Sequence, residues 1–173
     1  FAQLYGLDYR EVPLNDDFSL PLEPSWAGRR RGDRQPKRPH RQAVGLDAIR
    51  ALLEGNPQSV VLVDEAYVDF GAASAVDCEA YPNLVVVQTM SKPALAGLRV
   101  GYALADGNLI AALHSVKNSF NSYTWTLALA GAAGVLSEPD YLRQTRRDHS
   151  HPGADNGGLR AMGFQVADSA ANF

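Results

Sequence analysis

The sequence predicts an α/β fold of three layers, in which a mainly parallel β-sheet lies between helices. The first observation is a set of three continuous apolar runs, at residues 59–63, 84–88 and 99–104. Runs without polar alternation are typical of strands buried on both faces, as in parallel sheets under helices. The second observation is a helical spacing of apolar residues in the surrounding segments, at 46–54, 109–120 and 127–146.

Turn and breaker residues separate these elements. Asn56-Pro57 ends the first helical segment, Asp106-Gly107 precedes the second, and Glu138-Pro139 interrupts the third. The twenty residues between Val63 and Leu84 are enough for a crossover connection. The first two strands are therefore expected to be parallel neighbours.

Composition excludes several classes of protein. With 173 residues, 46% of them apolar and 20% charged, the chain is long enough to build one core. The net charge of −3 argues against a dedicated nucleic-acid binder, and no apolar run is long enough to span a membrane. The single cysteine, Cys78, indicates a reducing, cytoplasmic compartment. Because the chain opens at Phe1 without an initiator Met, we expect it to be part of a longer protein.

One segment, residues 27–42, differs from the rest of the chain. It holds six Arg and one Lys against a single acid, with two prolines and few apolar residues. Such a composition predicts a loop or disorder. A non-catalytic binding module that uses this basic loop to hold polyanions is one alternative function.

Two residues with chemical potential follow the first two strands. Asp64 ends the first strand and Lys92 lies just past the second, so parallel strands would bring both to the edge where ligands of open α/β sheets bind. A nucleotide hydrolase would also place an acid after an apolar strand, but the chain lacks a G-x-x-x-x-G-K-[ST] loop. Each residue alone is ordinary, since an Asp at a strand end often caps a turn and a Lys there is usually solvated.

Together the residues suit a pyridoxal-phosphate enzyme. Such an enzyme needs a lysine amine for the Schiff base, an acid to keep the pyridine nitrogen protonated, and donors for the phosphate. The candidate cofactor-binding residues are Asp64, Tyr67, Thr89, Ser91, Lys92 and Arg99, with Lys92 as the catalytic residue. No metal is expected, because the His149-x-His151 pair has no partner Cys or acid cluster.

Five strings carry a resemblance to a known family. They are residues 63–70 (VDEAYVDF), 83–92 (NLVVVQTMSK), 95–102 (LAGLRVGY), 117–123 (KNSFNSY) and 169–173 (SAANF). These strings resemble the histidinol-phosphate aminotransferases, a fold-type I pyridoxal-phosphate family. The likeness runs with gaps along the whole chain and covers about the middle half of such an enzyme.

The resemblance implies a role for each candidate residue. Lys92 would be the Schiff-base lysine, Asp64 would pair with the pyridine nitrogen, and Tyr67 would bond the phenolic oxygen. Ser91 and Arg99 would hold the phosphate, with Thr89 nearby. Residues 1–146 would be part of the large cofactor-binding domain and residues 147–173 the start of the small domain.

The resemblance also implies an activity. Family members transfer an amino group between glutamate and imidazole-acetol phosphate in histidine biosynthesis, as cytoplasmic homodimers that bind no nucleic acid or membrane. Other fold-type I enzymes, an aromatic aminotransferase or a phosphothreonine decarboxylase, stay open as alternatives. The chain by itself is expected to be inactive.

The sequence departs from the family pattern in three places. Residues 34–42 (RQPKRPHRQ) stand where the family has an N-P-N-x-P-T-G loop, yet suitable codons read one base later encode A-N-P-N-A-P-T-G. Residues 149–157 (HSHPGADNG) behave in the same way, which suggests compensated frameshifts that the encoding DNA would reveal. The third departure is a spacing from Lys92 to Arg99 that is one residue shorter than the family's, and it affects the proposed phosphate contact.

Overall fold

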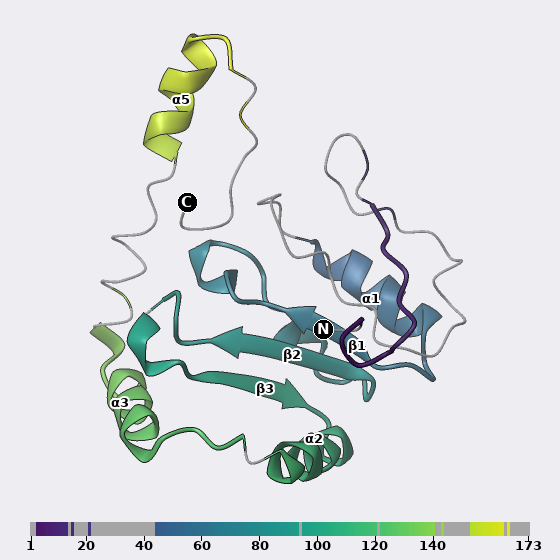
Figure 1. The fold of residues 1–173 in the computed structure, drawn as a ribbon. Coiled ribbons are helices and arrows are strands. Elements are labelled where there is room, and N and C mark those ends of the chain that lie inside the picture. The colour runs from purple at the N-terminus through teal and green to yellow at the C-terminus, as the bar shows by residue number, and fades with distance from the viewer. Residues whose placement is uncertain are drawn as a thin grey trace.

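The structure is a computed structural model of the whole chain. It describes residues 3–13, 15, 21, 44–93, 95–120, 122–140, 143, 153–164 and 166 (Figure 1). The basic segment 27–42 and the His149-x-His151 pair lie outside the described residues. The predictions made for them therefore stay predictions.

Three strands form the described sheet, in the order β1 (Val61–Asp64), β2 (Leu84–Thr89) and β3 (Gly101–Ala105). β1 and β2 pair in parallel, with Val61 opposite Leu84 and Asp64 opposite Val87. This pairing confirms that the first two apolar runs are parallel neighbours. The crossover between them contains the short 3-10 helices η2 (Val68–Phe70) and η3 (Ala75–Cys78).

β3 runs antiparallel to β2, with Thr89 opposite Gly101 and Val85 opposite Ala105. The α/β class is confirmed, but the described sheet is mixed, with one parallel and one antiparallel pair. The reason is the link of residues 90–100, which contains only the 3-10 helix η4 (Ala96–Leu98) and is shorter than the dozen or more residues that a parallel crossover requires.

Four α-helices accompany the sheet in the described part of the chain: α1 (Leu46–Gly55), α2 (Gly107–Ser119), α3 (Thr126–Leu136) and α5 (Gly153–Ala161). α2 begins after Asp106, whose carboxylate accepts a hydrogen bond from the backbone N–H of Asn108 at 2.9 Å. α3 ends at Leu136, just before Glu138-Pro139, in agreement with the break predicted there. Figure 1 shows α1 beside β1, with α2 and α3 on the side of β3.

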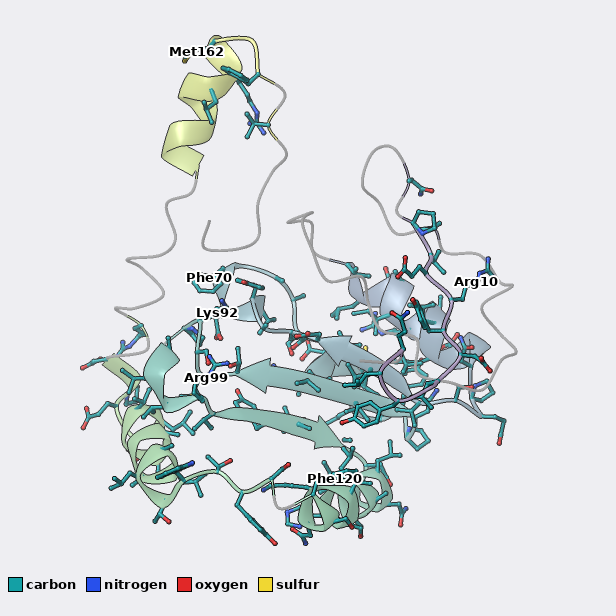
Figure 2. The ribbon with its side chains drawn as sticks, viewed as in Figure 1. Arg10, Phe70, Lys92, Arg99, Phe120 and Met162 are labelled. Carbon is teal, nitrogen blue, oxygen red and sulfur yellow. The ribbon has the colours of Figure 1, made fainter. Side chains whose placement is uncertain are left out.

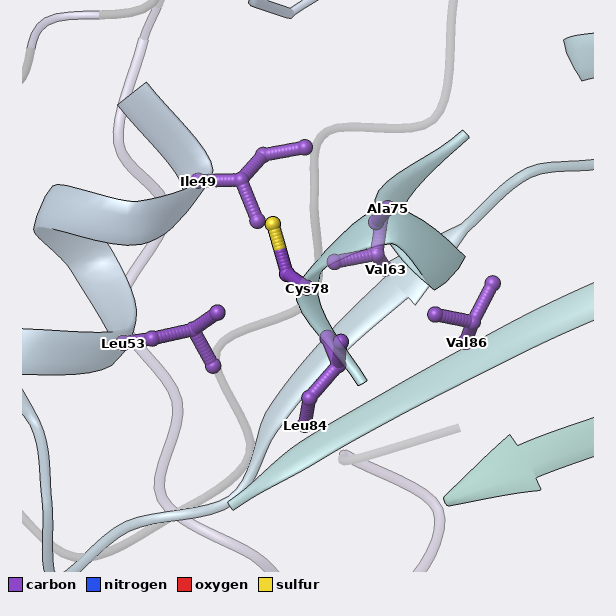
Figure 3. Close-up of a cluster of buried hydrophobic side chains, with 7 residues drawn as sticks. All are labelled: Ile49, Leu53, Val63, Ala75, Cys78, Leu84 and Val86. Atoms are coloured by element: carbon purple, nitrogen blue, oxygen red, sulfur yellow. The ribbon is translucent and has the colours of Figure 1, made fainter. Parts of the chain in front are cut away.

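The larger core cluster lies between α1, η3 and the parallel strands (Figure 3). Its buried residues are Ile49, Leu53, Val63, Ala75, Cys78, Leu84 and Val86. The periodicity of α1 places Ile49 and Leu53 on the face that packs against the sheet. Cys78 packs here as a small apolar residue, with its thiol free.

A second cluster joins α3 to the region between β2 and β3. Its buried members are Met90, Val100, Ala132 and Val135, with Leu98 packed against them. β3 itself is less covered than expected, because Tyr102 and Leu104 keep 41% and 42% of their surface exposed. The expectation of burial on both faces is therefore wrong for β3, which forms an edge of the described sheet. No helix in the described part of the chain is long and apolar enough to cross a membrane.

Candidate functional site

The candidate site lies at the carboxyl edge of the two parallel strands. β1 ends at Asp64, opposite Val87 in β2, and Lys92 follows the end of β2 by three residues. The Asp64 carboxylate accepts a hydrogen bond from the backbone N–H of Ala66 at 3.2 Å. Asp64 thus also shapes the turn that leaves β1, as an Asp at a strand end commonly does.

Lys92 and Tyr67 are in contact. The Lys92 ammonium nitrogen lies 5.2 Å from the centroid of the Tyr67 ring, within the range of a cation–π interaction. The Tyr67 ring also packs at a tilt of 45° against Phe70, with the centroids 6.4 Å apart. Figure 2 shows Phe70, Lys92 and Arg99 together at the end toward which β2 points.

Thr89 connects the end of β2 to both neighbouring segments. Its hydroxyl donates to the backbone carbonyl of Val100 at 3.2 Å and accepts from the backbone N–H of Ser91 at 3.1 Å. The hydroxyl therefore fixes the backbone before β3 and orients Ser91. Both Thr89 and Ser91 are half-buried.

Arg99 lies at the other end of the link between β2 and β3. It follows η4 and precedes Val100, whose carbonyl accepts from the backbone N–H of Met90 at 3.0 Å. Its φ of 54° is left-handed, and no other non-glycine residue in the described ranges has a positive φ. A non-glycine residue in this conformation carries a strain of roughly 1–2 kcal/mol. The position of the proposed phosphate ligand is thus set by a strained backbone.

Glu65, which directly follows Asp64, is an important residue that was absent from the candidate residues predicted from the sequence. At 9% exposure it is the one buried charged side chain in the described part of the chain. It lies two residues after buried Val63, so the two-residue period of a strand places both on the same face. A charged residue on an apolar strand face needs bonding partners, and that signal was present in the sequence.

The described residues contain no group of three His, Cys, Asp or Glu side chains that could hold a metal ion. Amine, carboxylate, hydroxyl and guanidinium groups instead come from the strand ends and the links that follow them. Such a set can attach an aldehyde, pair with a protonated ring nitrogen and bind a phosphate.

The chain is similar to a family of known enzymes. The family model for aminotransferase class I and II matches residues 42–173. The chain is 44% identical to histidinol-phosphate aminotransferase 1 of Pseudomonas aeruginosa, over all of this chain and 51% of that protein. The chain thus spans about half the length of the curated relatives it matches.

Solved structures share the fold. The histidinol-phosphate aminotransferase of Clostridium acetobutylicum superposes with a TM-score of 0.75 at 18% identity, covering 98% of this chain and 55% of that one. The histidinol-phosphate aminotransferase of Sinorhizobium meliloti, in complex with pyridoxal-5'-phosphate, gives a TM-score of 0.66 at 24% identity. That match covers 77% of this chain and 38% of the other.

Proposed function

The chain belongs to the aminotransferase class I and II family, and from this premise we propose that it is part of a pyridoxal-phosphate enzyme. The proposed reaction moves an amino group between glutamate and imidazole-acetol phosphate, a step of histidine biosynthesis. The 44% identity to histidinol-phosphate aminotransferase 1 of Pseudomonas aeruginosa supports this choice of substrate.

One observation carries the proposal, namely that the Lys92 amine lies over the Tyr67 ring at the sheet edge where Asp64 ends β1. An enzyme of this kind needs an amine and an acid on the same side of one binding site. The cation–π contact of 5.2 Å favours a position of the Lys92 amine at this edge of the sheet. The donor set of the site therefore fits the cofactor.

Each side chain then has a task. Lys92 supplies the amine that attaches the cofactor aldehyde, and it later carries protons to and from the substrate. Asp64 holds the proton on the ring nitrogen, and Tyr67 donates to the ring oxygen. Bound pyridoxal phosphate supplies an electron sink for the carbon that loses or gains the amino group.

Residues in and beside the link between β2 and β3 bind the phosphate end of the cofactor in this proposal. Ser91 and Arg99 hold the phosphate in this proposal. Thr89 keeps Ser91 in place through the bond to its backbone N–H. Because Arg99 presents a fork of donors, it matches phosphate oxygens in pairs.

Larger features of the enzyme belong to the same proposal. Residues 1–146 form part of the large domain and residues 147–173 begin the small one. The complete enzyme is a cytoplasmic homodimer whose substrates are small amino acids and phosphate esters. The 173-residue chain alone is inactive.

A chimera tests this function. Residues 1–173 replace the matching half of the Pseudomonas aeruginosa relative, in two versions. The first keeps the sequence as it stands, and the second takes the relative's own sequence in place of segments 27–42 and 149–157 and restores the missing residue between Lys92 and Arg99. We expect amino transfer from glutamate to imidazole-acetol phosphate only in the second chimera, and none when it also carries Lys92→Ala. Transfer to an aromatic 2-oxo acid alone, or decarboxylation of phosphothreonine, would instead support the other fold-type I activities.

A labelling experiment tests the cofactor assignment independently of substrate. Borohydride reduction in the presence of pyridoxal phosphate, followed by peptide mass mapping, should label Lys92 in the active chimera. Lys117, in α2, is the internal control and should stay unlabelled. Label on Lys117 in place of Lys92 would overturn the assignment.

A further inference from the structure

The Glu65 carboxylate gathers three hydrogen-bond donors from two segments distant in the chain. Its Oε1 accepts from the backbone N–H of Ala75 at 2.5 Å. Its Oε2 accepts from the Ser74 hydroxyl at 2.7 Å and from the Gln88 side-chain amide at 2.8 Å. An ionised carboxylate only accepts hydrogen bonds, so three donors around its two oxygens match its bonding capacity well.

The backbone of Glu65 is fixed as well. Its N–H donates to the carbonyl of Val87 at 2.8 Å, which extends the β1–β2 ladder by one residue. Its carbonyl accepts from the N–H of Val68 at 3.2 Å, which begins the turn into η2. Glu65 thus marks the point where the strand that carries Asp64 becomes the loop that carries Tyr67.

The bonds to Ser74 and Ala75 close this loop at its far end. The Ser74 hydroxyl also accepts from the N–H of Val76 at 3.2 Å and so caps η3. Ala75 is fully buried in the core cluster. Residues 65–75 therefore form a loop that is held at its base by one carboxylate and anchored to the core.

The bond to Gln88 connects the loop to the strand that leads to Lys92. Gln88 lies in β2, four residues before Lys92, and its side-chain oxygen accepts from the Tyr102 hydroxyl of β3 at 2.7 Å. A chain of bonds therefore runs from Tyr102 through Gln88 to Glu65. It spans all three described strands at the end where the site lies.

We propose that Glu65 is the positioning residue of the site, because its carboxylate fixes the 65–75 loop against the end of β2 and thereby keeps the Tyr67 ring against Lys92. The role in cofactor binding rests on the proposed function. The placement of the two side chains does not, since the Tyr67–Lys92 contact exists in the chain without any ligand.

The first experiment measures that placement in the cofactor-free chain. Reductive ¹³C-methylation marks the lysines and keeps their charge. The sequence contains only Lys37, Lys92 and Lys117. A methyl-lysine over the Tyr67 ring is shifted upfield by the ring current, and Lys92→Arg assigns the signal. We expect Tyr67→Leu to move the Lys92 signal to the position of the exposed Lys117 signal.

Variants of Glu65 should then shift the Lys92 signal in the same direction, because they release the 65–75 loop that carries Tyr67. Glu65→Ala is expected to move the Lys92 signal most of the way toward that of Lys117. Glu65→Gln, which keeps an oxygen for Ala75, should give an intermediate position. Glu79→Gln is the matched control, since Glu79 is an exposed glutamate just after η3, and it should leave the spectrum unchanged.

A milder variant covers the case in which Glu65→Ala does not fold. Gln88→Met removes the hydrogen bond between Glu65 and β2 but leaves the bonds of Glu65 to Ser74 and Ala75. It should therefore shift the Lys92 signal in the same direction, but by less. A Lys92 signal that stays in place in folded Glu65→Ala, or in Gln88→Met if Glu65→Ala is unfolded, overturns the proposal.

The second experiment adds the cofactor. Pyridoxal phosphate titrated into the active chimera should bind about 10-fold more weakly when Glu65 is replaced by Gln, a loss typical of groups that orient a ligating residue. If the Lys92 signal shifts as expected in the chain but the chimera binds no pyridoxal phosphate, the positioning role stands and the proposed function fails. Equal affinity in the Glu65→Gln and parent chimeras would refute the part that concerns the cofactor.

Discussion

Replacing Arg99 with glycine should separate backbone strain from ligand binding at the phosphate end of the site. Arg99 has a φ of 54°, a left-handed conformation that glycine adopts without steric cost. Alanine at the same position lacks the guanidinium group but keeps the strain. The pair Arg99→Gly and Arg99→Ala therefore differs in backbone freedom alone, while both variants lose the proposed phosphate contact.

The expected differences in stability and in cofactor affinity follow from the backbone strain and from the lost phosphate contact. The left-handed conformation costs alanine roughly 1–2 kcal/mol, and glycine loses about 0.5–1 kcal/mol more chain entropy on folding. Arg99→Gly should thus be more stable than Arg99→Ala, by up to about 1.5 kcal/mol. Loss of hydrogen bonds between a guanidinium and a phosphate, worth about 1.5–3 kcal/mol, should weaken pyridoxal-phosphate binding about 10- to 150-fold in both variants.

Urea unfolding of the two variant chains measures the first quantity, and the higher midpoint should belong to Arg99→Gly. A titration of pyridoxal phosphate into the active chimera measures the second. If Arg99→Gly unfolds at the lower urea concentration, the argument from backbone strain is refuted. If both variants bind the cofactor as tightly as the parent, Arg99 is not a phosphate ligand.

Three further predictions concern the scaffold. Leu53→Ala should lower the free energy of unfolding by about 2–5 kcal/mol, because Leu53 is 1% exposed in the core, whereas Leu127→Ala, at a side chain 84% exposed, should have little effect on the urea midpoint. Asn83→Ala should lower the free energy of unfolding by about 1–3 kcal/mol in the same assay, because the Asn83 side-chain amide lies 2.9–3.3 Å from three backbone carbonyls near the end of α1. Asn108→Ala is the surface control. Deletion of residues 27–42 should change neither the urea midpoint nor the retention of the chain on heparin at physiological salt. If the parent chain is instead retained in a salt-sensitive way and the deletion abolishes that retention, the alternative function as a basic-loop binding module is favoured.

The sequence predicted the parallel part of the sheet because two signals agreed there. The apolar runs located β1 and β2, and the length between Val63 and Leu84 allowed a crossover. The direction of β3 was not contained in its own residues, since an apolar run looks the same in a parallel and an antiparallel strand. The short link of residues 90–100 was the usable signal.

The candidate site was predictable to a similar degree. Strand ends placed Asp64 and Lys92 at one edge, and the structure adds the contact between Lys92 and Tyr67. The hydrogen bonds of Glu65 join residues up to 23 positions apart, so no local pattern reports them. The left-handed φ of Arg99 likewise depends on how the link between β2 and β3 closes, which is a tertiary property.

Packing against α3 closes that link and so determines where the proposed phosphate ligand lies. The Leu98 side chain lies directly over Gly131 of α3, where an added Cβ would come within 3.2 Å of both Leu98 methyl carbons. Gly131→Ala would therefore push Leu98 by a few tenths of an ångström, even though alanine favours a helix by about 1 kcal/mol. Leu98 adjoins Arg99, but a shift of a few tenths of an ångström at the Leu98 methyl carbons lies within the roughly half an ångström that a binding contact tolerates, so the Arg99 contact should survive this substitution. The glycine in α3 thus determines how closely the helix packs against the link that carries Arg99.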